Sequence, residues 1–526
     1  MTGVASRRRA GRAVGRAEYE NQLEAFWAAR EEALYRHVSG LSPDLDLEAI
    51  YAEHAALFDR ASVDRLQDAA DRAPDEGHRA RHLLAFATDG YIERAVASVT
   101  DAIASAEASA VVMWRGQRLP YRGVRGRLSE MSNRSERYVL FEALTAADDA
   151  INPMRRHRLD RVRELTSELG YADYLDLIRV TRGYDPDALV ATARDLLSAS
   201  ETMYYGALRR HLARIEIEQG DARLPDLWYL LRGIGWDHWF AANGVMGAVE
   251  DTLAGMGMRL ADQSGITVDL DDRPAKSLRP LTAAVRVPTD VRLAVQPQGG
   301  WDDYAATFHE VGHAAHLLAV EPGLSPAARL LGDRGLAEGY AQAFERIPGH
   351  PSWLGGQLRM TDDGAASFAD FFAFLWLHHV RRTAALVLAQ VRLHRGGQEA
   401  VDRAEYAGLV GLLTGVTEPE ARYLLAVDDG LGAADYLRGI MVDGCLTDDL
   451  ASRHGPTWWH SPEAGDELRD LWRRGLGPSA EDAVASLGYD HVDWRPVLRQ
   501  IRAQLIGEMS GYGGPNITTR AGSRKV

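Results

Sequence analysis

The spacing of apolar residues changes character in the middle of the chain. Three short runs rich in β-branched residues, 266–270, 281–287 and 291–295, are separated by prolines and aspartates. They predict three strands of a small antiparallel sheet. The next segment, 301–320, carries apolar residues at steps of four and three. This period predicts a helix that begins where the sheet ends.

Helical patterns dominate the rest of the chain. Before the sheet, segments rich in Ala, Leu, Arg and Glu extend from residue 18 to about residue 231, with breaks expected at Ser42–Pro43, Ala73–Pro74, Asn152–Pro153 and Asp185–Pro186. After it, the periodicity predicts helices over residues 333–346, 366–394, 403–413, 434–451, 461–475 and 480–505. We therefore expect a mainly α fold, in which two helical lobes flank a deep cleft and the small antiparallel β-sheet lies beside the helix at 301–320.

A chain of 526 residues exceeds the size that one hydrophobic core usually serves, so at least two lobes are expected. The change of pattern predicts an N-terminal helical lobe at 18–235 and a second lobe, with the sheet and the helix that follows it, at 236–506. Residues 1–17 are predicted to be a basic, disordered tail without the apolar core of a signal peptide. Residues 507–526 are predicted to be a flexible tail.

Charge and cysteine content narrow the classes of function. The formal net charge is −15 at pH 7 and the pI is near 5.6, which disfavours nucleic acid as a partner. The most apolar run, 371–377, is far too short to cross a bilayer, so we expect no membrane partner. Cys445 is the single cysteine of the sequence, which excludes internal disulfides and cysteine-based metal sites. These features are typical of a cytoplasmic protein and leave its oligomeric state open.

The helix after the sheet contains the sequence HEVGH at residues 309–313, which is an HExxH pattern. Residues four apart share one face of a helix, so His309 and His313 can bind the same metal ion. Glu310 lies next to the first histidine and can reach a water on that metal. The pattern alone is also compatible with two packed or exposed histidines.

A catalytic zinc needs a third protein ligand and one open position for water. Glu338 is the best candidate, because it lies on a predicted helix 25 residues after His313. Taken alone, without the HExxH pattern, Glu338 would be interpreted as a solvated surface acid. Glu345 lies two turns further on the same face and could hold the second nitrogen of a ligand histidine.

These residues resemble a known family. The sequence HEVGHAAH at 309–316 is similar to the HExGHxxH signature of the M3 peptidases, the thimet oligopeptidase and oligoendopeptidase F group, which are gluzincins with a glutamate as third zinc ligand. The resemblance assigns that role to Glu338 and a supporting role to Glu345, with Gln342 between them, and it matches His316 to a family histidine. Segment 461–505 is also similar to the last helices of this family and of the angiotensin-converting enzymes. The resemblance covers about residues 282–505 and implies one zinc ion per chain.

One stretch departs from the family pattern. Family members place a histidine and several tyrosines in a glycine-rich loop before a late helix, where they donate hydrogen bonds to substrate and transition state. The corresponding stretch, 422–443, contains no histidine, and one expected tyrosine is missing. Tyr436 falls where a family tyrosine would, and Tyr423 could substitute for another. Asp428 and Asp429 lie where donors would be wanted, and their charges would repel an oxyanion.

The leading interpretation is a zinc metallopeptidase that hydrolyses short peptides, with Glu310 as general base and Tyr436 as a donor to the oxyanion. The strand edge beside the metal could bind an extended peptide through main-chain hydrogen bonds. Two alternatives stay open. One is a metalloenzyme of the same scaffold that acts on a small amide-type or biosynthetic substrate. The other is a zinc-retaining peptide-binding protein, against which the intact Glu310 argues.

Overall fold

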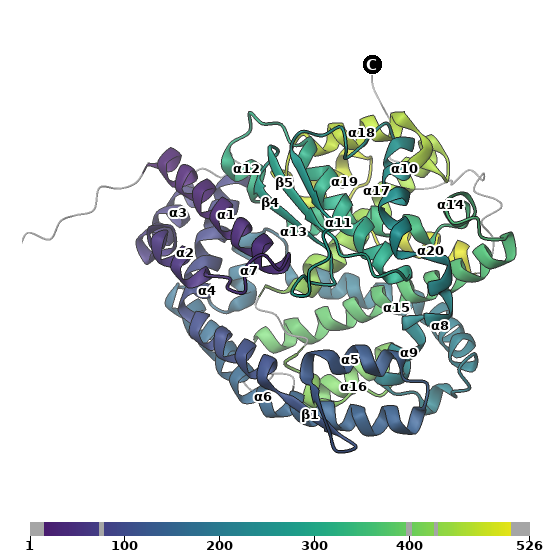
Figure 1. Cartoon of the computed structure of the whole chain (residues 1–526). Helices are drawn as coiled ribbons and strands as arrows, with labels where there is room; N and C mark the ends of the chain where they lie inside the picture. Colours follow the sequence, from purple (N-terminus) through teal and green to yellow (C-terminus); the bar gives the residue numbers. More distant parts are fainter. Residues whose placement is uncertain (1–14, 73–77, 396–401, 426–429, 506–526) are drawn as a thin grey trace, which may run out of the picture.

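In the computed structural model the chain is mainly helical and has two small sheets (Figure 1), which confirms the fold class expected from the sequence. The structure describes residues 15–72, 78–395, 402–425 and 430–505. Of the tail predicted at 1–17, the described part is the start of the first helix. The tail predicted at 507–526 lies outside the described residues.

The N-terminal half consists of helices with one β-hairpin between them. Its α-helices are α1 (Arg16–Val38), α2 (Leu47–Glu53), α3 (Arg60–Arg72), α4 (His78–Ser109), α5 (Tyr121–Glu130), α6 (Arg134–Glu168), α7 (Tyr174–Arg182), α8 (Pro186–Ala213), α9 (Leu224–Arg232) and α10 (Val245–Gly255). The hairpin pairs β1 (Val111–Trp114) with β2 (Gln117–Pro120). The break expected at Asn152–Pro153 is wrong, because α6 continues through Pro153. Asn152 holds the helix at this point by donating a hydrogen bond to the carbonyl of Ala421 at 2.7 Å.

The second sheet lies directly before the helix with the HExxH pattern, as expected. Its strands β3 (Ile266–Asp269), β4 (Leu281–Arg286) and β5 (Asp290–Ala294) are arranged in the order β3-β5-β4. β4 and β5 form an antiparallel hairpin, whereas β3 and β5 are parallel. The sheet is therefore mixed and not wholly antiparallel, because β5 returns from the hairpin into the space between the two earlier strands.

Helix α11 (Trp301–Ala319) follows the sheet after a sharp turn. Gly299 and Gly300 have φ angles of 80° and 98°, in the region that favours glycine. The Asp303 carboxylate accepts hydrogen bonds from the backbone N–H groups of Gln298 and Gly299 at 2.9 and 3.0 Å, which ties the turn to the helix. The α-helices that follow are α12 (Pro326–Leu330), α13 (Arg334–Glu345), α14 (Pro351–Gln357), α15 (Asp362–Arg395), α16 (Arg403–Thr414), α17 (Gly432–His454), α18 (Pro462–Trp472), α19 (Ala480–Ser486) and α20 (Arg495–Leu505).

The largest hydrophobic core joins the two segments predicted as lobes. It combines buried residues of α4, α7 and α8 with buried residues of α15, α17 and α20. The N-terminal helix α1 packs against β4 and α12, which belong to the second segment (Figure 1). The boundary expected near residue 235 thus marks a change of local structure and not a gap in the core. Within the described part of the chain, no helix combines the length and apolar character needed to cross a membrane.

Candidate metal centre

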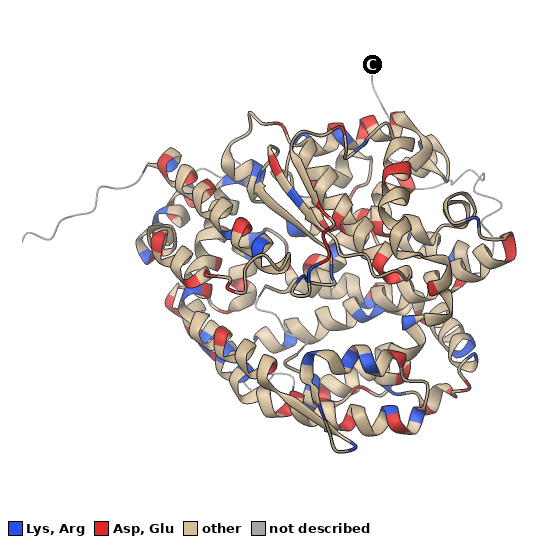
Figure 2. Ribbon diagram, viewed as in Figure 1, with Lys and Arg blue, Asp and Glu red and all other residues tan. Residues whose placement is uncertain are grey.

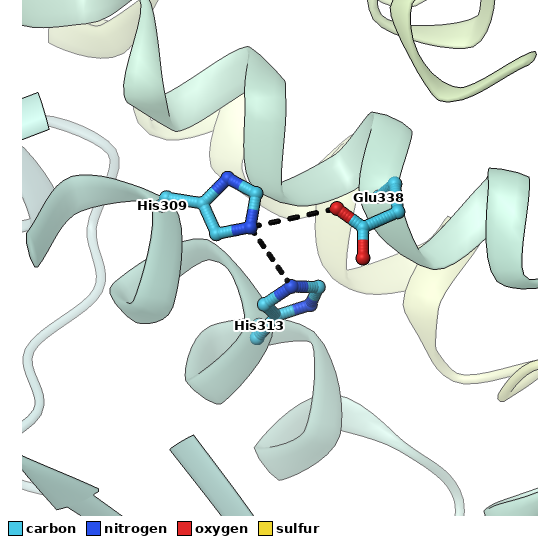
Figure 3. A group of neighbouring side chains, drawn as sticks. All are labelled: His309, His313 and Glu338. Carbon is cyan, nitrogen blue, oxygen red and sulfur yellow. Dashed lines mark hydrogen bonds and ion pairs between the residues drawn. The ribbon is translucent and has the colours of Figure 1, made fainter. Parts of the chain in front are cut away.

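Two helices bring three possible metal ligands together (Figure 3). His309 and His313 lie one turn apart on α11, and their Nε2 atoms are 3.2 Å apart. Glu338, on α13, places its Oε2 atom 3.5 Å from Nε2 of His309. Taking one ligand atom from each residue, all three lie within 4.8 Å of one another. The three residues selected from the sequence therefore form one group that could hold a metal ion.

The separations of 3.2 and 3.5 Å from His309 fit neighbouring ligand atoms of a tetrahedral ion. Bonds of about 2.0–2.1 Å in a tetrahedral arrangement place the ligand atoms about 3.3 Å apart. Among the described residues, the buried Oε2 atom of Glu338 has no hydrogen-bond partner. A buried carboxylate oxygen without a donor is unfavourable unless a cation binds it. Two imidazoles and one carboxylate are also a donor set that zinc uses in catalytic sites.

Glycines allow the ligand-bearing helices to approach closely. A β-carbon at Gly312 of α11 would lie 2.8 Å from Cα of Ala341 on α13. At a neighbouring position of α13, a β-carbon at Gly439 of α17 would lie 2.7 Å from Cβ of Glu338. Both distances are too short for a side chain, so α13 is held between two helices at positions where only glycine fits. This packing brings Glu338 within reach of the histidines.

Glu345 supports the first histidine. Its Oε2 atom accepts a hydrogen bond from Nδ1 of His309 at 2.9 Å. With the proton on Nδ1, the Nε2 atom keeps its lone pair and can bind a metal. This is the contact that the spacing of Glu338 and Glu345 on one helical face suggested.

The ligand residues and the glutamates around them carry more negative than positive charge. Burial lowers the pKa of His309, but the hydrogen bond and charge of Glu345, with the charges of Glu338 and Glu310, raise it to about 9. Burial and the neighbouring carboxylates raise the pKa of Glu338 to about 7, although His309 opposes them. Burial, with the positive charge of His309, holds the pKa of His313 well below its usual value, so this imidazole stays neutral. The excess of carboxylates favours a bound cation.

The carboxylate of Glu310 is held by the start of strand β4. The backbone N–H of Thr282 donates to Oε2 of Glu310 at 2.7 Å, and the Thr282 hydroxyl donates to the Glu310 backbone carbonyl, also at 2.7 Å. These two contacts connect the sheet to the face of α11 that carries Glu310.

The outer edge of β4 is less open than the sequence suggested. Residues two apart on a strand point their N–H groups the same way, and Thr282 and Ala284 both donate to carboxylates. Thr282 donates to Glu310, and Ala284 donates to Glu31 of α1, whose carboxyl pKa is raised mainly by burial. Glu31 is 7% exposed, so its carboxylate stays in place against the strand. An extended peptide can therefore pair with this edge of β4 only if the carboxylate of Glu310 or Glu31 moves away from the strand.

Tyr436 lies beside the metal group on α17. The pKa of Tyr436 is raised to about 12, mainly by the charge of Glu338. Burial and the charges of Glu345 and Glu310 act in the same direction, and the charge of Arg279 lowers it. Its side chain is 42% exposed, so a substrate can reach the hydroxyl. The charges that act on Tyr436 therefore come mainly from the glutamates around the metal group.

Two other residues selected from the sequence serve packing. The hydroxyl of Tyr423 accepts a hydrogen bond from Arg156 at 3.2 Å, and its ring lies against the guanidinium groups of Arg156 and Arg403. These contacts place it between α6 and α16 and not beside the metal ligands. His316 is buried against the rings of Tyr340 and Trp472, and burial lowers its pKa to about 4. Asp428 and Asp429, the two acids expected to oppose an oxyanion, lie outside the described residues.

A cavity of about 950 Å³ lies between the segment that carries Glu338 and the N-terminal helices. Glu338 forms part of its wall on the side of α13 and α17. The opposite wall comes from α1, α2 and α4 and includes the aromatic side chains of Trp27, Tyr51 and Phe86.

The sequence did not point to Thr282 as a contact of the site, nor to His379 as a neighbour of it. Thr282 is an ordinary strand residue, and its role becomes visible only when β4 meets α11. His379 on α15 is the neighbour of His378, which accepts or donates a hydrogen bond with the Tyr204 hydroxyl at 2.9 Å inside the core. Burial lowers the pKa of His379, and the charges of Glu345 and His309 also act on it. Its proximity to the site depends on how α15 packs, which no local pattern encodes.

Comparison of the sequence with models of known families and with curated proteins finds no match.

Proposed function

We propose that this protein is a zinc-dependent hydrolase that cleaves the peptide bonds of short peptides. The observation that carries the proposal is the convergence of His309, His313 and Glu338, with the carboxylate of Glu310 on the next residue of α11. Zinc held by three protein ligands keeps a position for water. The resemblance of residues 309–316 to the signature of the M3 peptidases supports the same assignment.

The residues around the ligands have distinct tasks in such a reaction. When bound, zinc supplies Lewis acidity that brings the pKa of a water toward neutrality. Glu310 takes the proton of the attacking water and passes it to the leaving amine. Burial raises the pKa of the Glu310 carboxyl, which makes it a better proton acceptor than an exposed carboxylate. Thr282 fixes one oxygen of this carboxylate and so sets its direction.

Tyr436 is the candidate donor to the developing oxyanion. A pKa near 12 keeps its hydroxyl protonated throughout the neutral range, so it can donate a hydrogen bond. Such a bond is stronger to an oxyanion than to the carbonyl of the ground state. The hydroxyl therefore contributes more to the rate of turnover than to substrate binding.

The test combines metal analysis with turnover. Purified protein is expected to contain about one zinc per chain and to cleave members of a mixed library of short peptides. Glu310→Gln is expected to retain zinc and fold but to lose turnover by several orders of magnitude, because it removes proton transfer and leaves every ligand in place. A Glu310→Gln protein as active as the parent would refute the proposed mechanism.

The outer edge of β4 is already occupied, which favours a second candidate function. This function is the hydrolysis of a small amide that does not pair with the strand. Both outward N–H groups near the metal, those of Thr282 and Ala284, already donate to carboxylates. A substrate that does not pair with this edge leaves both contacts intact. Rapid cleavage of N-acyl amino acids without cleavage of tetrapeptides and longer peptides would favour this candidate. Zinc-dependent binding of peptides without any turnover would instead indicate a binding protein.

A further inference from the structure

The cavity between α13 and the N-terminal helices is bounded by the face of α13 that carries Glu338. Four residues of this helix and its N-cap line the cavity: Asp333, Arg334, Ala337 and Glu338. Residues three and four apart share one face of a helix, so a single face of α13 forms this wall. The Glu338 side chain keeps 20% of its exposure. The cavity therefore lies beside a residue of the metal group, and its volume of about 950 Å³ is in the range of ligand sites.

The opposite wall of the cavity is aromatic. Trp27 of α1, Tyr51 of α2 and Phe86 of α4 line it, and each is partly exposed. Two buried rings pack behind them. The ring centre of Phe26 is 5.1 Å from that of Tyr51, and the ring centre of Phe58 is 5.2 Å from that of Phe86. The aromatic wall is thus held in place from behind and leaves apolar surface open to the cavity.

An ion pair connects the aromatic wall to the helix of the third ligand. Asp89 lies three residues after Phe86 on α4, and its carboxylate is 3.3 Å from the guanidinium group of Arg334. Arg334 lies four residues before Glu338 on α13. A path along two helical turns and one ion pair is on the order of 20 Å, which an extended peptide of about six residues spans. One short peptide can therefore contact both the metal group and the aromatic wall.

The charged side chains that line the cavity are largely paired with one another. Arg182 pairs with both Asp89 and Asp435 at 3.1 Å. Arg438 pairs with Asp333 at 2.7 Å. Figure 2 shows acidic and basic residues interspersed along α1, α2 and α4, so neither sign of charge dominates that side. A charged group would compete with these pairs, whereas the aromatic wall offers apolar surface that is still open.

Apolar surface in a cavity favours an apolar occupant. Water that contacts the three rings is released when an apolar side chain covers them. A further aromatic ring also gains from edge or offset contacts with the rings of the wall. Because Glu338 bounds the same cavity, a substrate at the metal group is the molecule that can supply such a side chain.

We propose that Trp27, Tyr51 and Phe86 bind a bulky apolar or aromatic side chain of the peptide whose scissile bond lies at the metal group. The inference rests on the proposed function for the bond that is cleaved. It narrows the substrates to peptides that carry such a side chain several residues from that bond. Peptides without one are expected to bind weakly.

The test uses full-length, zinc-loaded Glu310→Gln protein and a set of unlabelled octapeptides. The reference peptide contains only Ala and Ser, and each further peptide carries Phe at one position. Isothermal titration calorimetry measures every affinity. We expect Phe at one or two neighbouring positions to strengthen binding about tenfold or more, because burial of the ring removes apolar surface from water. Glu or Lys at the same position is expected to give no gain. Equal affinity for every peptide would overturn the proposal.

Substitutions on α2 then assign the effect to the cavity. Ala52 is an exposed residue of the cavity wall, so Ala52→Trp fills part of the space without removing a core side chain. In the Glu310→Gln background this change is expected to remove the preference for Phe and to leave affinity for the reference peptide unchanged. Ala49→Trp is the matched control, because Ala49 is exposed on the same helix but does not line the cavity. It should keep the preference. A preference that persists in Ala52→Trp, or equal weakening for all peptides, would overturn the proposal.

Cleavage by the protein with Glu310 intact, followed by chromatography, separates this proposal from the proposed function. Cleavage of the Phe-containing and reference peptides at equal rates, with equal affinities, overturns the apolar site and leaves the hydrolase intact. Binding that depends on Phe and is lost in Ala52→Trp, with no cleavage of any peptide, supports the apolar site and overturns the hydrolase.

Discussion

Nδ1 of His309 donates a hydrogen bond to Glu345 at 2.9 Å, although the two residues are 36 positions apart in the sequence. The bond joins α11 to the last turn of α13, two turns beyond Glu338 on the same helix. It sets the orientation of the imidazole ring and keeps Nε2 free for a metal. The affinity for metal is therefore expected to depend on a residue that does not itself bind the ion.

Glu345→Ala is expected to lower the affinity for zinc about 10- to 100-fold, the usual effect of removing the partner of a ligand histidine. The measurement is competition for zinc with a chromophoric chelator at neutral pH. Glu321→Ala, at an exposed position just after α11, is the control and should leave the affinity unchanged. Unchanged affinity in Glu345→Ala would show that the orientation of His309 is set by other contacts.

Gly439→Ala is expected to destabilise the protein by about 1–3 kcal/mol, because a β-carbon would lie 2.7 Å from Cβ of Glu338. Because the overlap displaces a metal ligand, zinc affinity should fall as well. Gly408→Ala in α16 is the matched control, since a β-carbon there meets nothing within 4 Å. It should stabilise the helix by about 0.5–1 kcal/mol. Urea unfolding and chelator competition measure both effects, and a stabilised Gly439→Ala would contradict the close approach of α13 and α17.

Local patterns predicted the elements that carry the ligands. Helix α11 ends one residue before the expected end at 320, and α13 follows Asp333, the expected start of the second helix. Hydrophobic periodicity and turn residues are properties of short segments, so the positions of His309, His313 and Glu338 on these helices followed from the sequence.

Contacts between distant segments could not be predicted in the same way. The parallel pairing of β3 with β5 depends on the path of the chain between strands. The helix expected at 480–505 is two helices, α19 and α20, which pack against different neighbours. The contact of Glu31 with the backbone of Ala284 joins α1 to β4, about 250 positions apart in the sequence, and no local spacing encodes it. The ligands were thus predictable, whereas the residues that hold and surround them were not.

Tyr436→Phe is expected to lower kcat by an amount equivalent to about 2–4 kcal/mol and to change KM little, because the hydroxyl interacts most strongly with the oxyanion. Tyr423→Phe should leave kcat unchanged, because its hydroxyl bonds to Arg156 away from the metal ligands. Steady-state kinetics on one cleaved peptide compares the two variants. A silent Tyr436→Phe with an inactive Tyr423→Phe would contradict the placement of both tyrosines.

Asp333 joins the start of α13 to α17 and α19. Its two carboxylate oxygens accept hydrogen bonds from Arg438 at 2.7 and 2.8 Å, and it also accepts from the backbone N–H groups of Gly335 and Ala480 at 2.9 Å. The side chains of Asp333 and Arg438 are both buried. Asp333→Asn is therefore expected to cost about 3–5 kcal/mol at pH 7, because it leaves a buried guanidinium without its main partner.

The pH dependence of the stability lost in Asp333→Asn identifies the interaction responsible for the loss. Burial alone raises the pKa of Asp333, but the charge and hydrogen bonds of Arg438, with two backbone donors, hold it below the usual value. Because the folded-state pKa is depressed, the stabilisation is present above the unfolded pKa of about 3.9 and is lost as the pH falls through the lower folded value. The stability difference between the parent and Asp333→Asn, measured by urea unfolding, should therefore be constant near neutrality and shrink below about pH 4. Asp262→Asn, at an exposed position, should show no such difference at any pH. A difference for Asp333→Asn that persists undiminished in acid would attribute the cost to packing and not to the ion pair.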